Sequence, residues 1–161
     1  MQAFVHFLSD LLVNGTMAGL SLDMEERQIL DILRTPDATE PFPAIGGKTL
    51  CYPGVSISLD SKHCVSYISF SMLEISAPVD HLLQPFKSIR QSLPRTITHS
   101  VLRDALAHLS SDVYMEIPWE SISIIYRGIS GGEIHVPMDE QVVQQATLYS
   151  VDRMGPFLID V

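Results

Sequence analysis

Apolar and polar residues alternate through residues 55–72, which read Val-Ser-Ile-Ser-Leu-Asp-Ser-Lys-His-Cys-Val-Ser-Tyr-Ile-Ser-Phe-Ser-Met. The run 55–59 alternates aliphatic residues with serine, and the run 67–72 alternates Ile, Phe and Met with Tyr and Ser. The polar turn Asp60–His63 separates the two runs. This pattern predicts an antiparallel hairpin with one apolar face and one serine-rich face.

Two segments of helical period precede this hairpin. Residues 2–13 carry apolar residues at helical spacing, which predicts a first helix. A second helix is predicted from Asp23, because Asp23-Met-Glu-Glu26 has the pattern of a capping box. It should end before Pro36, since the residue ahead of a proline disfavours helical backbone. With a short strand over 49–52, the first half predicts two helices followed by three strands.

The second half of the chain echoes the first at nearly constant spacing. His6-Phe-Leu8 returns as His81-Leu-Leu83, Leu22-Asp23 as Ile97-Thr98, and Tyr52-Pro-Gly-Val-Ser56 as Tyr126-Arg-Gly-Ile-Ser130. Echoes that recur in the same order predict an internal duplication, with units at 1–76 and 77–161 in one compact globule. Coincidence within a single α+β domain is the alternative.

The amino-acid composition limits the classes of protein to which this chain can belong. Of the 161 residues, 46% are hydrophobic and 18% are charged, which excludes a disordered chain and allows a sizeable core. The chain carries 19 Asp and Glu against 10 Lys and Arg, and its net charge of −9 argues against binding to nucleic acid. No apolar run approaches the roughly 18 residues of a membrane span, and no signal peptide is recognisable. We therefore expect a cytoplasmic protein without membrane association.

The residues offer no recognisable catalytic or metal-binding pattern. Cys51 and Cys64 are expected to be half-buried thiols in strands, with a disulfide or a redox pair as the alternative. His63 and Cys64 are adjacent, and adjacent strand residues point to opposite faces, so they do not predict a metal site. The run Gly128–Gly132 lacks the following Lys of a phosphate-binding loop and predicts a hairpin turn. We expect no catalytic residues, metal or cofactor, and keep an enzyme with a cryptic site as the least favoured class.

Aromatic residues in the predicted strands are the main candidates for partner contact. Core packing is their usual role, but Tyr and Trp are also common interface anchors. Tyr67 is the strongest candidate, because Ser69 shares its face while the alternating apolar residues occupy the other. Glu133 and His135 are expected on an exposed face as well. The predicted partner-binding residues are Tyr52, Tyr67, Ser69, Trp119, Glu133 and His135.

The segment Gly19–Leu33, followed by Pro36-Asp37 and a Tyr-x-Gly-Val strand, resembles the helical entry of SmpA-like and beta-lactamase-inhibitor-protein-like folds. The resemblance spans residues 15–72, with a fainter copy over 94–150. It implies a helical entry before an antiparallel sheet, and in the inhibitor proteins a tandem sheet clamps a target protein. The same entry motif occurs in small bacterial proteins that look like antitoxin or immunity proteins. Arg34-Thr-Pro36 stands where glycine is usual in these families. We therefore expect from the resemblance only that the chain binds a target protein, and not that the target is a beta-lactamase.

These observations predict an α+β fold made of a tandem helix-helix-antiparallel-sheet unit. The helices should pack on one sheet face, each unit's own two helices covering its strands, and the other face should form a broad open surface. Such surfaces suit proteins better than small molecules. The leading hypothesis is a non-catalytic binding protein that neutralises a partner protein, as an immunity protein neutralises a basic bacterial toxin. An acidic type III secretion chaperone that binds an effector segment is the alternative.

Overall fold

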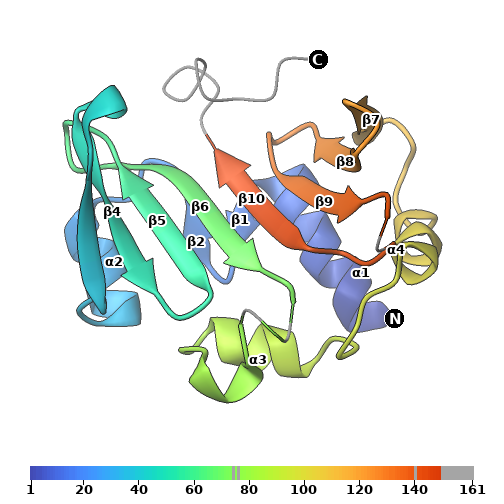
Figure 1. Cartoon of the computed structure of the whole chain (residues 1–161), viewed down its shortest axis with the longest axis horizontal. Helices are drawn as coiled ribbons and strands as arrows, with labels where there is room; N and C mark the ends of the chain where they lie inside the picture. Colours follow the sequence, from blue (N-terminus) through green and yellow to red (C-terminus); the bar gives the residue numbers. More distant parts are fainter. Residues whose placement is uncertain (74, 76, 140, 150–161) are drawn as a thin grey trace.

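The computed structural model describes residues 1–73, 75, 77–139 and 141–149 (Figure 1). Within this part of the chain, eight strands form one antiparallel sheet in the order β3-β4-β5-β6-β10-β9-β8-β7. The strands are β3 (Ala38–Phe42), β4 (Gly47–Tyr52), β5 (Val55–Leu59), β6 (Val65–Ser71), β7 (Tyr114–Trp119), β8 (Ser123–Gly128), β9 (Glu133–Pro137) and β10 (Gln145–Tyr149). Each half of the chain contributes four consecutive strands, and the halves meet where β6 pairs with β10. The predicted α+β class is confirmed.

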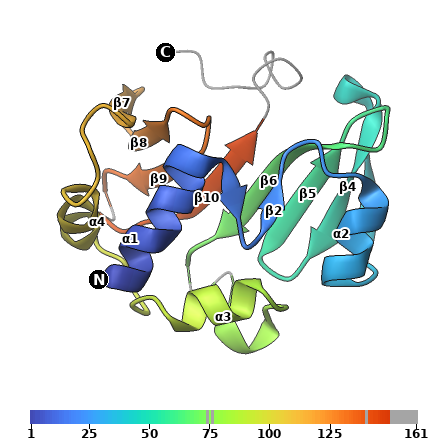
Figure 2. The same ribbon diagram turned by 180° about the vertical axis from the view of Figure 1, so that it is seen from behind.

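The helices and a small hairpin lie on one side of this sheet. The helices are α1 (Gln2–Ser9), α2 (Glu26–Leu33), α3 (Phe86–Gln91) and α4 (His99–Leu106), with the π-helical turn η1 (Asp10–Asn14) after α1 and the short turns η2 (Pro43–Ile45) and η3 (Val79–His81). The small hairpin pairs β1 (Thr16–Met17) with β2 (Leu20–Ser21). Figure 2 shows α1, β2 and α2 in front of the sheet, whereas Figure 1 shows the opposite face with no helix over it. None of the helices in the described residues is long and apolar enough to span a membrane.

Alternate strand residues build one core that runs through both halves. Ile57 lies directly opposite Leu50 on β4 and Ile68 on β6, and Ile68 lies opposite Leu148 on β10. All four side chains are buried and belong to a single apolar cluster with Leu8 of α1. Full burial of such a side chain stabilises the fold by about 1.5–3 kcal/mol relative to exposure.

Two helices pack against strands that belong to the other predicted unit of the chain. The backbone of η1 meets Gly128 and Gly132 so closely that a Cβ there would lie 2.1 Å from the Leu12 carbonyl oxygen and 2.2 Å from that of Leu11. In the other direction, Phe86 of α3 packs edge-on against Phe70 of β6, with ring centroids 5.0 Å apart. The prediction that each unit's own two helices cover its strands is therefore wrong for α1 and α3. Only glycine allows the approach of η1 to the second half.

The central hairpin and its neighbours form as the alternation predicts. The strands β5 and β6 pair antiparallel, and the predicted strand at 49–52 lies within β4. A bulge at Ser66, opposite the step from Ser58 to Leu59, keeps Tyr67 and Ser58 on the same face. The strand β3 was not predicted. It is an exposed edge strand containing Pro41, without the alternation that marks a half-buried strand.

The second helix begins three residues later than its predicted start. Asp23 has a φ of 71°, outside the helical region, and Glu25 forms an isolated bridge with Cys64. The capping box is present but uses Glu25 and Gln28 in place of Asp23 and Glu26. Pairing with the segment ahead of β6 therefore overrides the local capping signal.

Other local predictions can be compared with the structure directly. The Gly128–Gly132 run forms the β8–β9 turn, as predicted. Cys51 and Cys64 are half-buried free thiols, Cys51 in β4 and Cys64 just before β6. The echoed segments Tyr52–Ser56 and Tyr126–Ser130 occupy equivalent places in the two halves. Each begins in the second strand that its half contributes to the large sheet, β4 or β8, and runs into the turn that follows. Residue 76, at the predicted unit boundary, and residues 150–161 lie outside the described residues, and the duplication stays a prediction.

Candidate functional site

The sheet face over which the described residues place no helix, called here the open face, is lined mainly by hydroxyl and charged side chains. Two rows of directly paired residues cross it. The first row is Cys51, Ser56, Ser69, Thr147, Glu133 and Arg127, and the second is Glu40, Thr49, Ser58, Tyr67 and Tyr149. Because strand side chains alternate between faces, these residues share the side opposite the main core.

A shallow groove, the hydroxyl groove, occupies the first half of the open face. Its volume is about 430 Å³, and it is lined by Glu40, Pro41, Phe42, Thr49, Ser56, Ser58 and Tyr67. On its floor, Thr49 Oγ1 and Ser58 Oγ are 2.9 Å apart and share a hydrogen bond. Short side chains on the middle strands leave room between Phe42 and the half-buried Tyr67. The groove therefore offers hydroxyl groups for hydrogen bonds and two rings for apolar contact.

A buried carboxylate lies at the centre of the second half of the open face. The side chain of Glu133 is only 2% exposed. Its Oε2 accepts hydrogen bonds from Arg127 Nε at 2.5 Å and from the Tyr149 hydroxyl at 2.7 Å. On the other side, His135 Nε2 lies 3.3 Å from Glu133 Oε1 and 3.3 Å from Thr147 Oγ1. We call these five residues the carboxylate cluster.

Hydrogen bonding keeps Glu133 ionised despite its burial. Burial raises the pKa of the Glu133 carboxyl, but hydrogen bonds from His135, Tyr149 and Arg127 outweigh it and hold the pKa below its ordinary value. Burial and the neighbouring carboxylate raise the pKa of Tyr149, so its hydroxyl stays a donor. A low-pKa carboxylate with its oxygens already engaged is a poor proton acceptor. The chemistry of the carboxylate cluster is therefore to fix side chains on the open face.

Four of the six predicted site residues come together on the open face. Tyr67 lies between Ser58 and Tyr149 on neighbouring strands, and burial raises the pKa of its hydroxyl. Ser69 accepts a hydrogen bond from Gln145 Nε2 across the β6–β10 pair. His135 is half-buried beside Glu133. Glu133 was expected to be exposed, and that expectation is wrong, because Arg127 and Tyr149 engage its carboxylate within the face.

The other two predicted residues lie elsewhere. Tyr52 is buried on the helix-covered face, where its hydroxyl donates to the Arg34 carbonyl oxygen at 2.9 Å, just after α2. Its predicted role in partner contact is therefore corrected: Tyr52 lies two residues from Leu50 and shares the core face with it. Trp119 is half-buried at the end of β7, paired with Ser123. It lies at the far edge of the sheet from the hydroxyl groove.

Sequence reasoning missed Arg127, Thr147 and Tyr149. Arg127 could have been identified from the sequence. It lies across the β8–β9 turn from Glu133, carries the opposite charge, and faces the same side of the sheet. No comparable signal existed for Thr147 or Tyr149. Their strand, β10, pairs with β9, which places Thr147 directly opposite Glu133 and the Tyr149 hydroxyl 2.7 Å from Glu133 Oε2.

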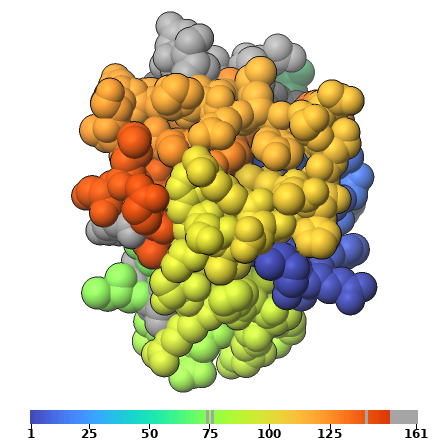
Figure 3. Space-filling view, turned by 90° about the vertical axis from the view of Figure 1, so that its right-hand side faces the viewer, coloured from blue at the N-terminus to red at the C-terminus, as the bar shows by residue number. Residues whose placement is uncertain are grey.

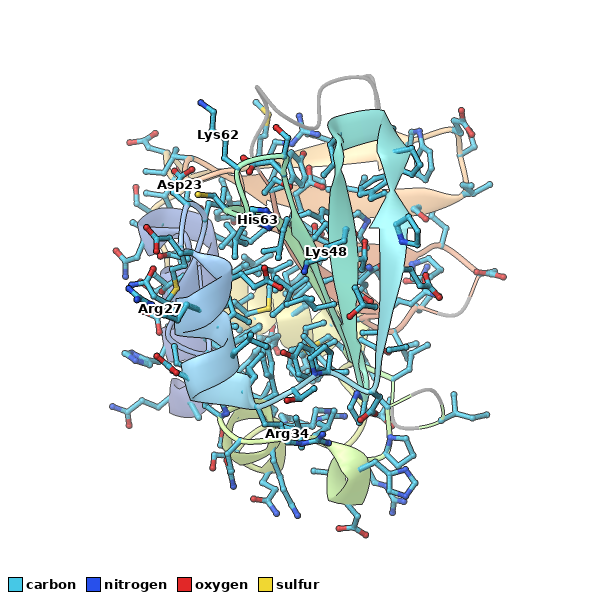
Figure 4. The ribbon with its side chains drawn as sticks, turned by 90° about the vertical axis from the view of Figure 1, so that its left-hand side faces the viewer. Asp23, Arg27, Arg34, Lys48, Lys62 and His63 are labelled. Carbon is cyan, nitrogen blue, oxygen red and sulfur yellow. The ribbon has the colours of Figure 1, made fainter. Side chains whose placement is uncertain are left out.

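At a separate end of the molecule, near α2, positively charged side chains lie beside carboxylates. Figure 4 shows this end facing the viewer. Lys48 Nζ lies 2.6 Å from Glu26 Oε1, and His63 Nδ1 lies 3.4 Å from Glu26 Oε2. Arg34 Nη2 is 3.4 Å from Asp37 Oδ1. Arg27 and Lys62 are labelled at the same end (Figure 4). This end is a mixture of both signs.

Comparisons with known proteins add no family to these observations. No protein-family model, curated protein or solved structure matches the chain. Among the residues that the structure describes, no three His, Cys, Asp or Glu side chains are grouped as metal ligands. The resemblance to SmpA-like and inhibitor-like folds therefore stays a prediction.

Proposed function

We propose that this protein is a non-catalytic, cytoplasmic binding protein that neutralises a partner protein, and that it acts as an immunity protein against a bacterial toxin. The open face of the eight-stranded sheet is the observation that carries this proposal. A broad face that no helix covers, with aromatic rings among hydrogen-bonding groups, has the composition of a protein interface.

The open face is already held in a fixed shape, which favours binding without a large rearrangement. The carboxylate cluster ties β8, β9 and β10 together through buried hydrogen bonds. Gln145 of β10 bonds Ser69 of β6, which continues the network towards the hydroxyl groove. A surface whose side chains are fixed before binding loses less conformational entropy in the complex.

The charge of the chain supports a basic partner. A net charge of −9 attracts basic proteins over long distances and speeds their association, an effect that salt weakens. Toxins that act on nucleic acids carry basic surfaces, because they must bind phosphates. An acidic protein is therefore suited to neutralise such a toxin.

We also propose that the two sets of four strands arose by duplication of one unit, with units at 1–76 and 77–161. The sequence echoes and the mirrored strand order on either side of the β6–β10 pair support this proposal. A duplicated unit doubles the width of the open face within one chain.

The proposal is tested with the product of the gene next to the one that encodes this chain. We expect the purified proteins to bind and expect co-expression to rescue growth from that product. Ser56→Arg, which fills the hydroxyl groove, should weaken binding and rescue without lowering the melting temperature. Ser92→Arg, at an exposed serine beyond the end of α3, is the matched control. Failure of the wild-type chain to bind or to rescue growth would remove the basis of the toxin proposal.

The alternative function, an acidic chaperone for a secreted effector, is favoured by one observation. The hydroxyl groove borders the edge strand β3 and is open along its length, so an extended segment could lie in it. A chaperone should bind an isolated, unfolded effector fragment as tightly as the whole partner. An immunity protein should bind only the folded toxin.

A further inference from the structure

Large apolar side chains gather on the outermost strand of the second half. Met115 on β7 is 58% exposed, Ile122 in the β7–β8 turn 55%, and Met138 after β9 42%. Half-buried Trp119 completes this group, which we call the β7 edge surface. Figure 3 faces this side of the molecule, and residues 114–128 form the orange band across its upper part, above α4 in yellow.

A buried apolar base supports this surface. Ile117 of β7 and Ile125 of β8 pair directly, are 7% and 0% exposed, and stand outside the main core cluster. They share the open-face parity of Met115 and Trp119, so this part of the β7 edge surface continues the open face to its margin. Exposed apolar side chains over a buried apolar base resemble the centre of a protein interface.

The turn that presents Ile122 is conformationally unfavourable. Ile122 N donates to the Trp119 carbonyl oxygen at 3.0 Å, and the two residues between them, Glu120 and Ser121, have φ values of 48° and 60°. Such a turn suits Asn-Gly, since side chains disfavour positive φ at both positions. The Met138 amide donates to the Ile122 carbonyl oxygen at 2.9 Å and holds the two apolar side chains near each other. Backbone strain of this kind concentrates at functional sites.

The two edges of the sheet are built differently. The outer strand β3 presents Glu40 and Pro41, a charge and a proline of the kind that protect an edge against unwanted contacts. The outer strand β7 instead presents large apolar side chains. Pro118 removes one backbone donor from β7, so a partner should dock on its side chains and not extend the sheet.

The charges around the β7 edge surface point to the chemistry of the partner. Exposed Glu120 lies in the turn between Trp119 and Ile122, and exposed Glu116 lies next to Met115 on β7, with its side chain towards Arg103 of α4. Among the described residues, Arg103 lies 3.6 Å from Glu116 and Arg127 lies 2.5 Å from Glu133. The α2 end, with its own ion pairs, lies at the opposite end of the sheet from β7 (Figure 1).

We propose that the β7 edge surface docks a basic protein, with Ile122 entering an apolar site that Lys or Arg side chains surround. This inference rests on the proposed function and names the part of the molecule that first contacts the partner. The apolar residues should set the lifetime of the complex, and the glutamates should set the rate of association.

The first experiment measures binding of the neighbouring gene product to variants at both ends of the sheet. We expect Ile122→Glu to weaken binding at least tenfold, and Ile32→Glu, at a 43% exposed isoleucine on α2, to leave it within twofold. Reversing Glu116 and Glu120 to lysine should slow association at least tenfold in low salt. Reversing exposed Asp31 on α2 is the control, and the two effects are compared per charge reversed. Unchanged melting temperatures will confirm that the variants fold.

The second experiment places a photo-crosslinking amino acid at position 122, or at position 32 as control, in cells that express the chain. A basic protein crosslinked only from position 122, whose purified form loses affinity with Ile122→Glu, supports the proposal even when the neighbouring gene product does not bind. Full binding by Ile122→Glu, with loss in Ser56→Arg, overturns the docking site and leaves the proposed function standing. Crosslinks only to a second copy of this chain, or to no protein, overturn the docking site.

Discussion

Replacing Glu133 by glutamine should remove about 3 kcal/mol from the free energy of unfolding at pH 7. Glutamine keeps the shape of the side chain but leaves Arg127, which is 25% exposed, without its counter-charge. Breaking a buried ion pair costs about 3–5 kcal/mol, and the partial exposure of Arg127 places the loss at the lower end. For a chain of this size, a loss of about 3 kcal/mol lowers the melting temperature by roughly 6–12 °C. Urea denaturation and thermal melts measure both quantities.

The pH dependence gives a second, independent measurement of the same effect. The folded state lowers the pKa of Glu133, so the ionised carboxylate stabilises the fold fully above its unfolded pKa of about 4.3. This contribution is lost as the pH falls through the lower, folded pKa. The stabilities of the wild type and Glu133→Gln should therefore differ by a constant amount above about pH 5 and converge in stronger acid.

A control substitution at an exposed glutamate shows whether the loss of stability depends on the burial of the carboxylate or only on its charge. Glu116 is on the same half of the sheet, its side chain is 48% exposed, and it lies 3.6 Å from Arg103. Exposed ion pairs contribute little, so Glu116→Gln should unfold like the wild type at every pH. If Glu133→Gln also unfolds within about 0.5 kcal/mol of the wild type, the buried carboxylate does not hold the open face together, and the reasoning is refuted.

Three further substitutions test the packing. Phe86→Ala should cost about 3 kcal/mol in urea denaturation, because it empties the site beside Phe70, and a loss below about 1 kcal/mol would contradict that contact. Gly128→Ala should destabilise the fold by at least about 2 kcal/mol, since its Cβ would lie 2.1 Å from the Leu12 carbonyl oxygen. A melting temperature equal to that of the wild type would show that η1 does not pack there. Thr98→Ala should cost about 1 kcal/mol, because its hydroxyl accepts from the Val101 amide and caps α4, and Thr98→Ser should restore most of the stability.

Local patterns predicted the elements that have one buried face. The alternation in residues 55–72 identified β5 and β6, and the helical spacing in residues 2–13 identified α1. The edge strand β3 has no buried face and therefore no alternation to detect. The start of α2 was misplaced for a different reason, because Glu25 pairs with Cys64, nearly 40 residues away.

The candidate site was predictable only where its residues share a hairpin. Tyr67 and Ser69 follow from the alternation of one strand, and Glu133 and His135 from that of another. Which two hairpins become neighbours depends on the pairing of β6 with β10, and no local pattern reports it. The burial of Glu133 has a more local origin, since Tyr149 reaches it from β10, the strand that pairs with β9.

The packing of the α1–η1 segment against the second half of the sheet has a consequence for synthesis of the chain. The turn that receives the α1–η1 segment is synthesised more than a hundred residues after it, and Ser130 Oγ donates to the Leu11 carbonyl oxygen across that interval. The apolar side of α1 must therefore wait for the last strands before it is covered. A nascent chain of this protein should stay sensitive to proteases until β8 and β9 emerge, and a fragment ending near residue 76 should not fold alone.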